Sequence, residues 1–304
     1  MFGGAAVKTK GLTRRSAEFL LAAVIIARAT GYLFSKLVLE GMGVFNLLAV
    51  RFLLGFVLLA ALFFKRLIRI DHKSLVAGLV MGGMFFLVMT AELNGLKRTA
   101  SSMISFLENT AIVVVPLLQA ALSRSLPRKK AVASALLSLA GVALLTLSGS
   151  VKFGLGELFG ILAAVLYAGA ILATDRFSHG GIDALAAGIV QVGTVGALSL
   201  AASLLTETPR LPMGTEWIGV AMLAVVCTGF GFTLQPVAQS GTTADRAGMF
   251  CALNPLVASV LGVVFLHEQL APQGALGAVL ILAGILMSEL PEEKLPRLLK
   301  LKRC

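Results

Sequence analysis

Charged residues are scarce in this chain of 304 residues. Only 13% of the residues are charged and 58% are hydrophobic, whereas soluble domains are roughly 25% charged and about 45–50% apolar. A water-soluble core of this size could not bury so much apolar surface. The composition therefore excludes an ordinary soluble domain and predicts a membrane protein.

Residues that hold metals or form disulfides are scarce as well. The three cysteines and three histidines have neither the spacing of a zinc site nor that of a disulfide framework. Cys227 and Cys251 fall inside predicted helices, where we interpret them as packing residues. The sequence has no P-loop lysine signature, no G-x-S-x-G elbow and no H-E-x-x-H motif. We therefore expect no cofactor, no metal site and no enzymatic activity.

Long apolar runs are what the sequence does contain. A helix that crosses a bilayer needs ~20 predominantly apolar residues, because its backbone polar groups must be satisfied within the hydrocarbon. The runs lack the alternation of β-strands, so we predict an all-α integral membrane protein with about ten transmembrane helices. The predicted spans are residues 17–38, 44–64, 74–96, 100–121, 130–149, 155–176, 183–205, 216–239, 243–266 and 272–290.

Positive charge lies mainly between these runs. In a soluble protein a formal net charge of +11 would suggest a nucleic-acid partner, but here we expect none, because the charge sets the orientation in the membrane. Most of the lysines and arginines between spans fall on one side, which predicts a protein of the cell membrane with both termini cytoplasmic. Residues 291–304 are predicted to form a basic cytoplasmic tail that touches anionic membrane lipid. The residues on the opposite side are Lys97, Arg98, Lys152 and Arg210.

The sequence also contains an internal repeat. The pairs that align its two copies are Thr99-Ala100 with Thr243-Ala244, and Ala140-Gly141-Val142 with Ala283-Gly284-Ile285. The two halves, residues 1–150 and 151–290, then hold about five spans each, and an odd number inserts the second half with opposite polarity. Such inverted repeats are typical of secondary transporters, whose substrate site lies near the middle of the bilayer between the halves.

Ionisable side chains inside the spans of the first half are candidate site residues, because burying a charge in a membrane is costly. Arg28 and Tyr32 lie one helical turn apart. Arg28 either belongs to a structural ion pair or binds a substrate carboxylate. Glu108, followed by Asn109, is either the structural partner of Arg28 or a group that carries a proton. Glu92 is a second candidate for proton coupling and lies nearer the end of its span.

The spans of the second half carry neutral polar side chains instead. Tyr167 stands at the repeat position of Arg28, and Gln191 stands near that of Arg51. The residues of this half that we expect to contact a substrate are Tyr167, Gln191, Gln235, Gln239 and Asn254.

Prolines and glycines shape several of the spans. Pro236 frees the carbonyl of Phe232 four residues earlier, and this carbonyl either serves a ligand or marks a kink needed only for packing. Gly78-x-x-x-Gly82 and Gly156-x-x-x-Gly160 allow close approach of helices. We interpret both pairs as contacts within one chain and expect a monomer.

A family resemblance is carried by the second repeat. Leu253-Asn254-Pro255 is followed by an apolar run to Leu266, by His267-Glu268-Gln269-Leu270 and by the stretch from Gly277 to Gly284. This order of a Pro-containing helix, a Glu-bearing link and a Gly-rich closing helix resembles the EamA-type transporters of the drug/metabolite transporter superfamily. The first repeat departs from it, since Asn109-Thr110-Ala111-Ile112 stands where the second repeat has Ala252-Leu253-Asn254-Pro255.

What the resemblance implies is ten helices in two inverted five-helix repeats, a central cavity, and alternating access driven by gradients of substrate or protons. Bacterial members of the family include exporters of amino acids, other metabolites and drugs. The aromatic amino acid exporters are one branch.

Together, the residues and the resemblance predict a secondary active transporter that exports small-molecule metabolites such as amino acids. One alternative is a proton-coupled exporter of drugs or cations, in which Glu108 binds lipophilic cations. Two others are a membrane-embedded enzyme that acts on lipid and a scaffold or sensor that transports nothing.

Overall fold

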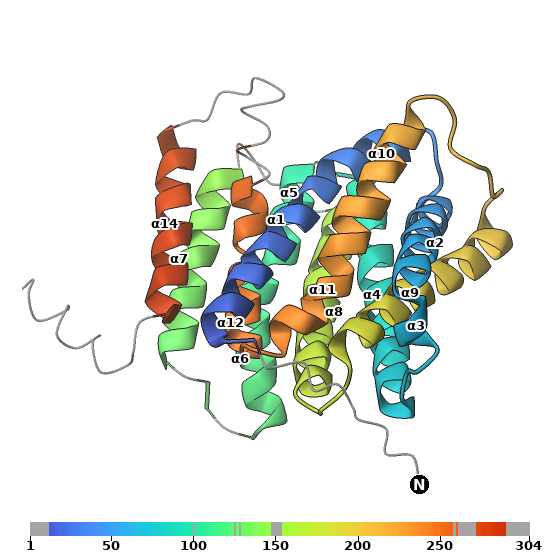
Figure 1. Ribbon diagram of the computed structural model, residues 1–304. Coiled ribbons are helices and arrows are strands. Elements are labelled where there is room, and N and C mark those ends of the chain that lie inside the picture. Colours follow the sequence, from blue (N-terminus) through green and yellow to red (C-terminus); the bar gives the residue numbers. More distant parts are fainter. Residues whose placement is uncertain are drawn as a thin grey trace, which may run out of the picture.

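The described part of the chain folds into helices (Figure 1). We describe the protein from a computed structural model, which covers residues 12–99, 101–124, 126–127, 129–146, 154–257, 260 and 272–289. The helices of the first half are α1 (Arg14–Leu39), α2 (Val44–Leu62), α3 (Phe64–Leu67), α4 (His72–Leu96), α5 (Ser101–Asn109), α6 (Ala111–Leu122) and α7 (Lys129–Thr146). Those of the second half are α8 (Leu155–Ser178), α9 (Ala184–Thr206), α10 (Glu216–Met222), the π-helix η1 (Leu223–Phe232), α11 (Thr233–Gln239), α12 (Ala244–Phe250) and α14 (Pro272–Glu289).

Seven helical stretches within these ranges are long and apolar enough to cross a membrane. They are α1, α2, α4, α8, α9, the stretch Met103–Leu122 through α5 and α6, and the stretch Glu216–Gln239 from α10 to α11. No strand occurs in the described ranges. The prediction of an all-α protein with membrane-spanning helices is therefore confirmed for them. The link between the predicted ninth and tenth spans, with His267 and Glu268, lies outside the described residues.

Two helices that begin side by side start with aspartate caps. Asp71 accepts a hydrogen bond from the backbone N–H of Ser74 at the start of α4, and Asp183 accepts one from that of Ala186 at the start of α9, both at 3.1 Å. Such caps satisfy amide groups that have no partner inside the helix. The hydroxyl of Ser74 also donates to Asp71 at 2.5 Å, and this bond is the main reason that the pKa of Asp71 lies below its ordinary value.

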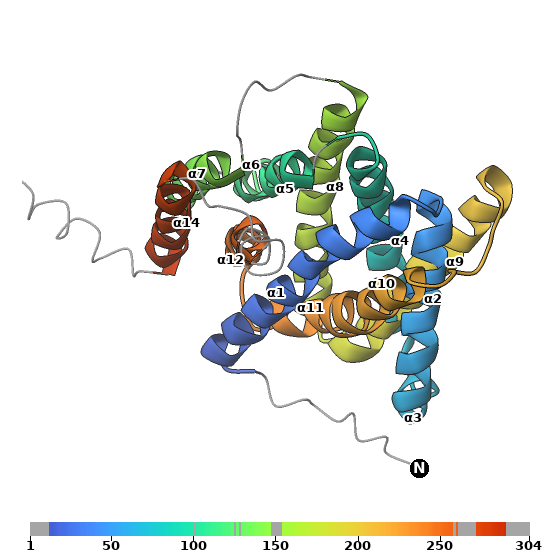
Figure 2. The same cartoon turned by 90° about the horizontal axis from the view of Figure 1, so that it is seen from above.

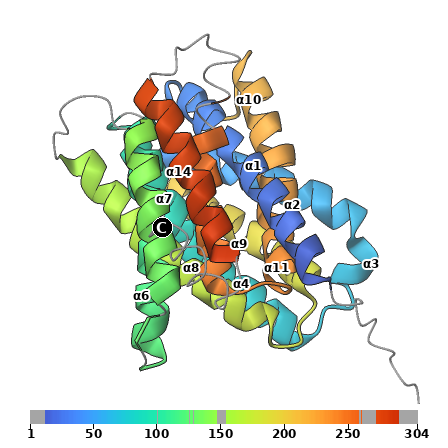
Figure 3. The ribbon, with the colours of Figure 1, turned by 90° about the vertical axis from the view of Figure 1, so that its left-hand side faces the viewer.

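The helices of the two halves interleave. α4 packs against α8 and α9, while α1 packs against η1 and α2 against both α9 and η1. Seen from above, α1 runs obliquely across the bundle, and α7 and α14 lie together at its edge beyond α12 (Figure 2). Figure 3 shows α14 and α7 side by side along their length. Each half thus contributes its last helix to this pair.

Glycines permit the closest of these approaches. A Cβ atom on Gly141 of α7 would lie 2.7 Å from the backbone N of Ile281, and one on Gly284 of α14 would lie 2.9 Å from the carbonyl O of Ser134. These two glycines are the pair that the sequence repeat aligns. Real Cβ atoms do not approach other atoms so closely, so both contacts require glycine.

The two glycine motifs of the sequence also lie at contacts between helices of the same chain. A Cβ atom on Gly82 of α4 would lie 2.9 Å from the carbonyl O of Gln191 in α9. One on Gly160 of α8 would lie 2.9 Å from Cβ of Leu107 in α5. Their interpretation as intramolecular packing is confirmed.

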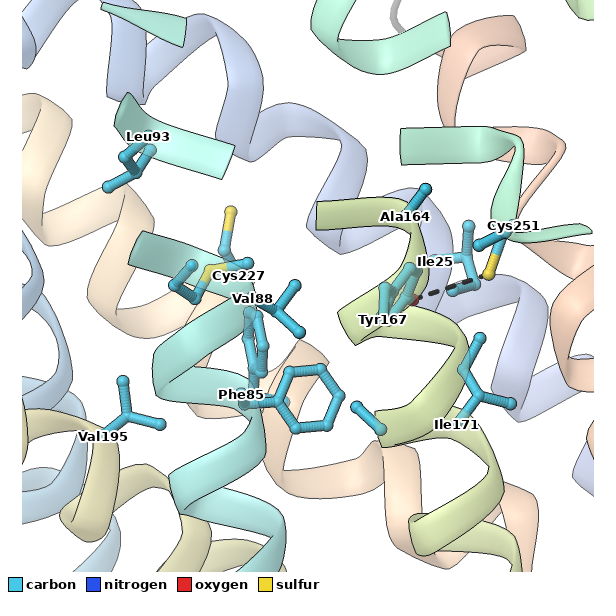
Figure 4. Packing of buried hydrophobic residues seen from close by; sticks show 14 of the residues in the cluster. Ile25, Phe85, Val88, Leu93, Ala164, Tyr167, Ile171, Val195, Cys227 and Cys251 are labelled. Atoms are coloured by element: carbon cyan, nitrogen blue, oxygen red, sulfur yellow. Dashed lines mark hydrogen bonds between the residues drawn. The ribbon is translucent and has the colours of Figure 1, made fainter. Parts of the chain in front are cut away.

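The core between the halves is apolar and aromatic (Figure 4). The rings of Phe85 from α4 and Tyr167 from α8 meet edge to face, with 6.1 Å between their centroids. The thiol of Cys251 donates to the Tyr167 hydroxyl at 3.5 Å, and Cys227 is also buried and unoxidised. The interpretation of these two cysteines as packing residues is confirmed.

Candidate functional site

Arg28 lies at the centre of the molecule and joins the two halves. Its side chain is buried in the middle of α1, where Nη1 donates to the hydroxyl of Tyr167 at 2.6 Å and to Oε1 of Gln235 at 2.8 Å. Its Cζ atom lies 4.3 Å from the centroid of the Phe232 ring, which places the cation over an aromatic face. The two positions that the repeat aligns, Arg28 and Tyr167, are thus in direct contact.

A second buried arginine, Arg51, faces the same ring from α2. It is 4% exposed, its Nε donates to Oγ1 of Thr228 at 2.8 Å, and its Cζ lies 5.7 Å from the Phe232 centroid. The sequence pattern marks Arg51 only as the counterpart of Gln191, and Arg51 was not predicted as a site residue. The signal that identified Arg28, a charge inside an apolar span, would have found it.

Two glutamates, Glu92 and Glu108, are buried in the same central region as the two arginines. Oε2 of Glu108 accepts a hydrogen bond of 2.5 Å from the hydroxyl of Tyr32, and no ion pair joins Glu108 to Arg28, although both lie in described helices. Tyr32, not Arg28, is therefore the direct partner of Glu108. Glu92 of α4 is 8% exposed, and no described residue donates a hydrogen bond to its carboxylate.

Both arginines, Tyr32 and Glu92 line a small cavity with an accessible volume of about 20 Å³. A volume of this size holds about one water molecule, so a metabolite can bind only where the helices move apart and widen the cavity. It joins helices from both halves. The residues that line it are Arg28, Gly31, Tyr32, Arg51, Met89, Glu92, Phe232 and Asn254.

The π-helix η1 brings Thr228 and Phe232 to the arginines. Its wider turn is followed by Pro236, which has no N–H to bond the carbonyl of Phe232. That carbonyl accepts a hydrogen bond from Nε2 of Gln191 at 3.5 Å. π-helical turns are rare and frequently lie at functional sites. The carbonyl predicted to be free thus meets a donor from α9, and the ring of the same residue lies under both guanidinium groups.

The remaining predicted residues lie outside the cavity lining. Nδ2 of Asn109 donates to the carbonyl O of Ser105 in its own helix at 2.6 Å. Gln191 acts only through Phe232. Gln239 is buried near the end of α11, and its Oε1 has no hydrogen-bond partner. Of the predicted residues, Arg28, Tyr32, Glu92 and Asn254 line the cavity. Glu108, Tyr167 and Gln235 are bonded to Tyr32 or Arg28, whereas Asn109, Gln191 and Gln239 neither line the cavity nor bond to a side chain that does.

A pair of family matches identifies the type of protein. The EamA-like transporter family matches residues 15–147 and again residues 154–290. The chain belongs to the EamA-like transporter family. It is therefore a multi-pass membrane protein that transports small molecules.

Relatives of this EamA-like transporter extend along almost the whole chain. It is 25% identical over 282 residues to an uncharacterized transporter of Archaeoglobus fulgidus, with 89% of this chain and 96% of that protein covered. A crystal structure matches with a TM-score of 0.75 at 23% identity, covering 91% of this chain and 97% of the other. At that identity the structural likeness concerns the fold alone.

Proposed function

We propose that this EamA-like transporter is a secondary active transporter that exports small amphipathic metabolites such as amino acids. The observation that carries the proposal is the buried polar cavity between the halves, with Arg28, Arg51 and Glu92 in its wall. Burying three charged groups in a membrane protein is costly, and such groups commonly mark substrate pathways. Aromatic and apolar surface from Phe232 and Met89 in the same wall suits an amphipathic substrate.

The proposal includes ten spans in two inverted repeats, residues 1–150 and 151–290, in one chain of the cell membrane with cytoplasmic termini. Reciprocal packing supports the repeats: α4 of the first half packs on α8 and α9, and η1 of the second half packs on α1 and α2. The family match to residues 15–147 and 154–290 gives independent support. An inverted repeat of this kind places the substrate site at the interface of its halves.

Alternating access requires contacts between the halves that can open at each end. On the side with most of the basic residues, Arg66 of α3 pairs with Asp183 before α9 at 2.5 Å, and Glu18 of α1 pairs with Arg246 of α12. We propose that these polar contacts close the cytoplasmic end. Both pairs are partly exposed, and ion pairs that water reaches contribute little, about 0–1 kcal/mol at fully exposed sites, so we propose that they break and re-form during transport.

Polar contacts also join the halves at the opposite end. The backbone N–H of Asn46 at the start of α2 donates to Glu207 at 2.7 Å, and its side-chain amide donates to the carbonyl O of Arg210 at 3.0 Å. Arg210 in turn pairs with Glu216 at 2.6 Å. We propose that this network closes the outer end when the cytoplasmic end opens.

A second candidate is a proton-coupled exporter of lipophilic cations. The observation that favours it is Glu92, a buried carboxylate in the cavity with no donor from any described residue. Two arginines in the same wall oppose it, because they repel a cation. In this candidate Glu108 or Glu92 carries the proton, and Glu108→Gln abolishes transport of cations.

Counterflow in proteoliposomes tests the proposal. The purified chain is reconstituted and supplied with a panel of amino acids, nucleosides and lipophilic cations, with and without a pH gradient. We expect amino acids to move above the rate of empty liposomes. If Glu108→Gln abolishes cation transport and no amino acid moves in the wild type, the cation exporter is correct. If no member of the panel moves, the proposal is wrong for these classes.

The matched control for Glu108→Gln is Glu40→Gln. Glu40 is exposed at the end of α1 and makes no contact with the cavity. It carries the same substitution and is expected to transport like the wild type.

A further inference from the structure

The first helix of each half carries an acid at the same repeat position. Arg28 and Tyr167 are 139 residues apart, and the same spacing aligns Glu18 near the start of α1 with Glu157 near the start of α8. Each acid binds a residue of the other half. The two contacts have the same repeat position but lie at opposite ends of the molecule, as their neighbours show.

Glu157 holds the connection between α4 and α5. Its Oε1 accepts a hydrogen bond of 2.6 Å from the hydroxyl of Thr99, and its Oε2 accepts one of 2.7 Å from the backbone N–H of Gly154, which caps α8. Nζ of Lys36, near the end of α1, donates to the carbonyl O of Leu96 at 2.6 Å and to that of Thr99 at 3.2 Å. Thr99 thus ties the end of α1 to the start of α8.

Glu18 holds the start of α12 at the other end. It lies about 27 Å from Lys36 along α1, at a rise of about 1.5 Å per residue. Its Oε1 accepts a charged hydrogen bond from Nη1 of Arg246. Asp175, the repeat counterpart of Lys36, accepts a hydrogen bond from the backbone N–H of Ala244, the first residue of α12. The start of α1 and the end of α8 therefore hold this connection together.

Small residues let both connections close tightly. A Cβ atom on Gly156, next to the acid of α8, would lie 3.0 Å from Cβ of Thr99. A Cβ atom on Gly241, in the connection before α12, would lie 2.6 Å from Cβ of Ala17, next to the acid of α1. Gly156 and Ala17 also occupy the same repeat position. The two ends thus share the packing as well as the polar contact.

We infer that Thr99 and Glu157 form a gate at the outer end, as the repeat counterpart of a cytoplasmic gate formed by Glu18 and Arg246, and that the two gates open in turn. The inference rests on the proposed function and adds the outer gate and its repeat relation to it. The structure makes both contacts at once, around a cavity too small for a metabolite. An inverted repeat gives its two ends equivalent contacts, so opening one gate while the other stays closed produces two related states.

Sided labelling tests the gates without any substrate. The reporter is Met89→Cys, at a position that lines the cavity, in a chain whose three native cysteines are replaced by alanine. A membrane-impermeant maleimide reaches the outer end in whole cells and the cytoplasmic end in inverted membrane vesicles. The ratio of the two initial rates reports which end is open more of the time.

The outer gate is opened by Thr99→Val, which removes the hydroxyl and leaves the cap by Glu157 in place. We expect labelling from outside to rise about 2–10-fold relative to labelling from the cytoplasmic side, because one hydrogen bond between the halves is lost. Thr99→Ser keeps a hydroxyl and should give the wild-type ratio. The matched control is Thr206→Val, because the exposed hydroxyl of Thr206 donates only to the carbonyl O of Ala202 in its own helix, at 2.8 Å.

The cytoplasmic gate is opened by Arg246→Gln. We expect the ratio to move in the opposite direction, by about 2–5-fold, because a partly exposed ion pair contributes less than a buried contact. The matched control is Arg14→Gln. Arg14 donates to the same Oε1 of Glu18 at 2.8 Å but belongs to α1 itself, so its loss leaves α12 in place and the ratio unchanged.

Shifts in opposite directions support the inference. It is overturned if the two variants shift the ratio in the same direction, if neither shifts it, or if the controls shift it as much as the variants do. Size-exclusion profiles in detergent identify a variant that does not fold, and Glu157→Gln or Glu18→Gln then takes its place with the same expected direction. Counterflow judges the proposed function separately: opposite shifts in a chain that moves no amino acid support the gates and overturn only the substrate class.

Discussion

The first half of the chain supplies every ionisable acid and base that we place at the centre, Arg28, Arg51, Glu92 and Glu108, while the second half supplies neutral groups there. The neutral groups are Tyr167, Thr228, Phe232, Gln235 and Asn254. Each arginine of the first half donates a hydrogen bond to a hydroxyl of the second half: Arg28 to that of Tyr167 and Arg51 to that of Thr228. One half carries the charge and the other orients it.

At the edge of the molecule the halves are instead equivalent. α7 and α14 approach each other through repeat-related glycines, Gly141 and Gly284, and each fits against the backbone of the other helix. The repeat-related helices are similar where they pack against each other, because each needs a glycine at the same close approach. The chemistry diverged where the two copies face one shared cavity.

The largest expected effect comes from removing the central charge. Arg28→Gln removes the donor that Tyr167 and Gln235 share. It also removes a positive charge that offsets the negative charge of the two buried glutamates. Removing one partner from a set of buried charges costs about 3–5 kcal/mol of stability. We expect counterflow to fall by roughly a hundredfold or more. The control is Arg15→Gln, an exposed position on the same helix. If Arg28→Gln keeps half of the wild-type rate, the charge of the first half is not central to transport.

The next effect sharpens the comparison within the site. Tyr32→Phe removes the donor of the 2.5 Å hydrogen bond to Glu108, so the buried carboxylate of Glu108 loses this donor. Hydrogen bonds to charged groups contribute about 1.5–3 kcal/mol. Initial rates of counterflow should fall about tenfold or more. An unchanged rate would mean that Glu108 needs no partner from α1.

The symmetric edge is tested by Gly141→Ala and Gly284→Ala. Each added Cβ meets backbone of the facing helix, and overpacking of this kind costs about 1–3 kcal/mol. Thermal unfolding in detergent should show similar losses for the two variants. The control is Gly83→Ala, where an added Cβ has nothing within 4 Å. If one glycine tolerates alanine and its counterpart does not, the edge is as asymmetric as the centre.

The smallest effect concerns the other tyrosine. Tyr167→Phe removes one hydrogen bond from Arg28, but Gln235 still accepts from the same nitrogen at 2.8 Å, so the loss should be smaller than the about 1.5–3 kcal/mol of a bond to a charged group that has no second partner. Counterflow should fall a few-fold, less than in Tyr32→Phe. A greater loss in Tyr167→Phe would reverse the assigned roles of the two halves.

Much of this arrangement follows from sequence pattern, because a charge within an apolar run must find a polar partner. That argument identified Arg28, Tyr32 and Glu108. It could not say which groups meet, because distances between helices depend on packing. Glu108 therefore pairs with Tyr32 and not directly with Arg28.

Other features depend on local backbone geometry that periodicity does not report. The predicted span 216–239 is one run in the sequence, yet residues 223–232 form a π-helix. Pro236 suggested only that a carbonyl would be free, and the position of Gln191 on a different helix decides what binds it. Similarly, the fourth predicted span is divided at Thr110, between α5 and α6.

The central claim is that substrate binds in the cavity between the halves. Met89 lines this cavity, so we propose to measure maleimide labelling of Met89→Cys in a chain whose three native cysteines are replaced by alanine. Met213→Cys, at an exposed loop position, is the control. The account predicts that a transported amino acid slows labelling at position 89 several-fold and leaves position 213 unchanged. Labelling at position 89 that proceeds at the same rate with and without a transported substrate would contradict it.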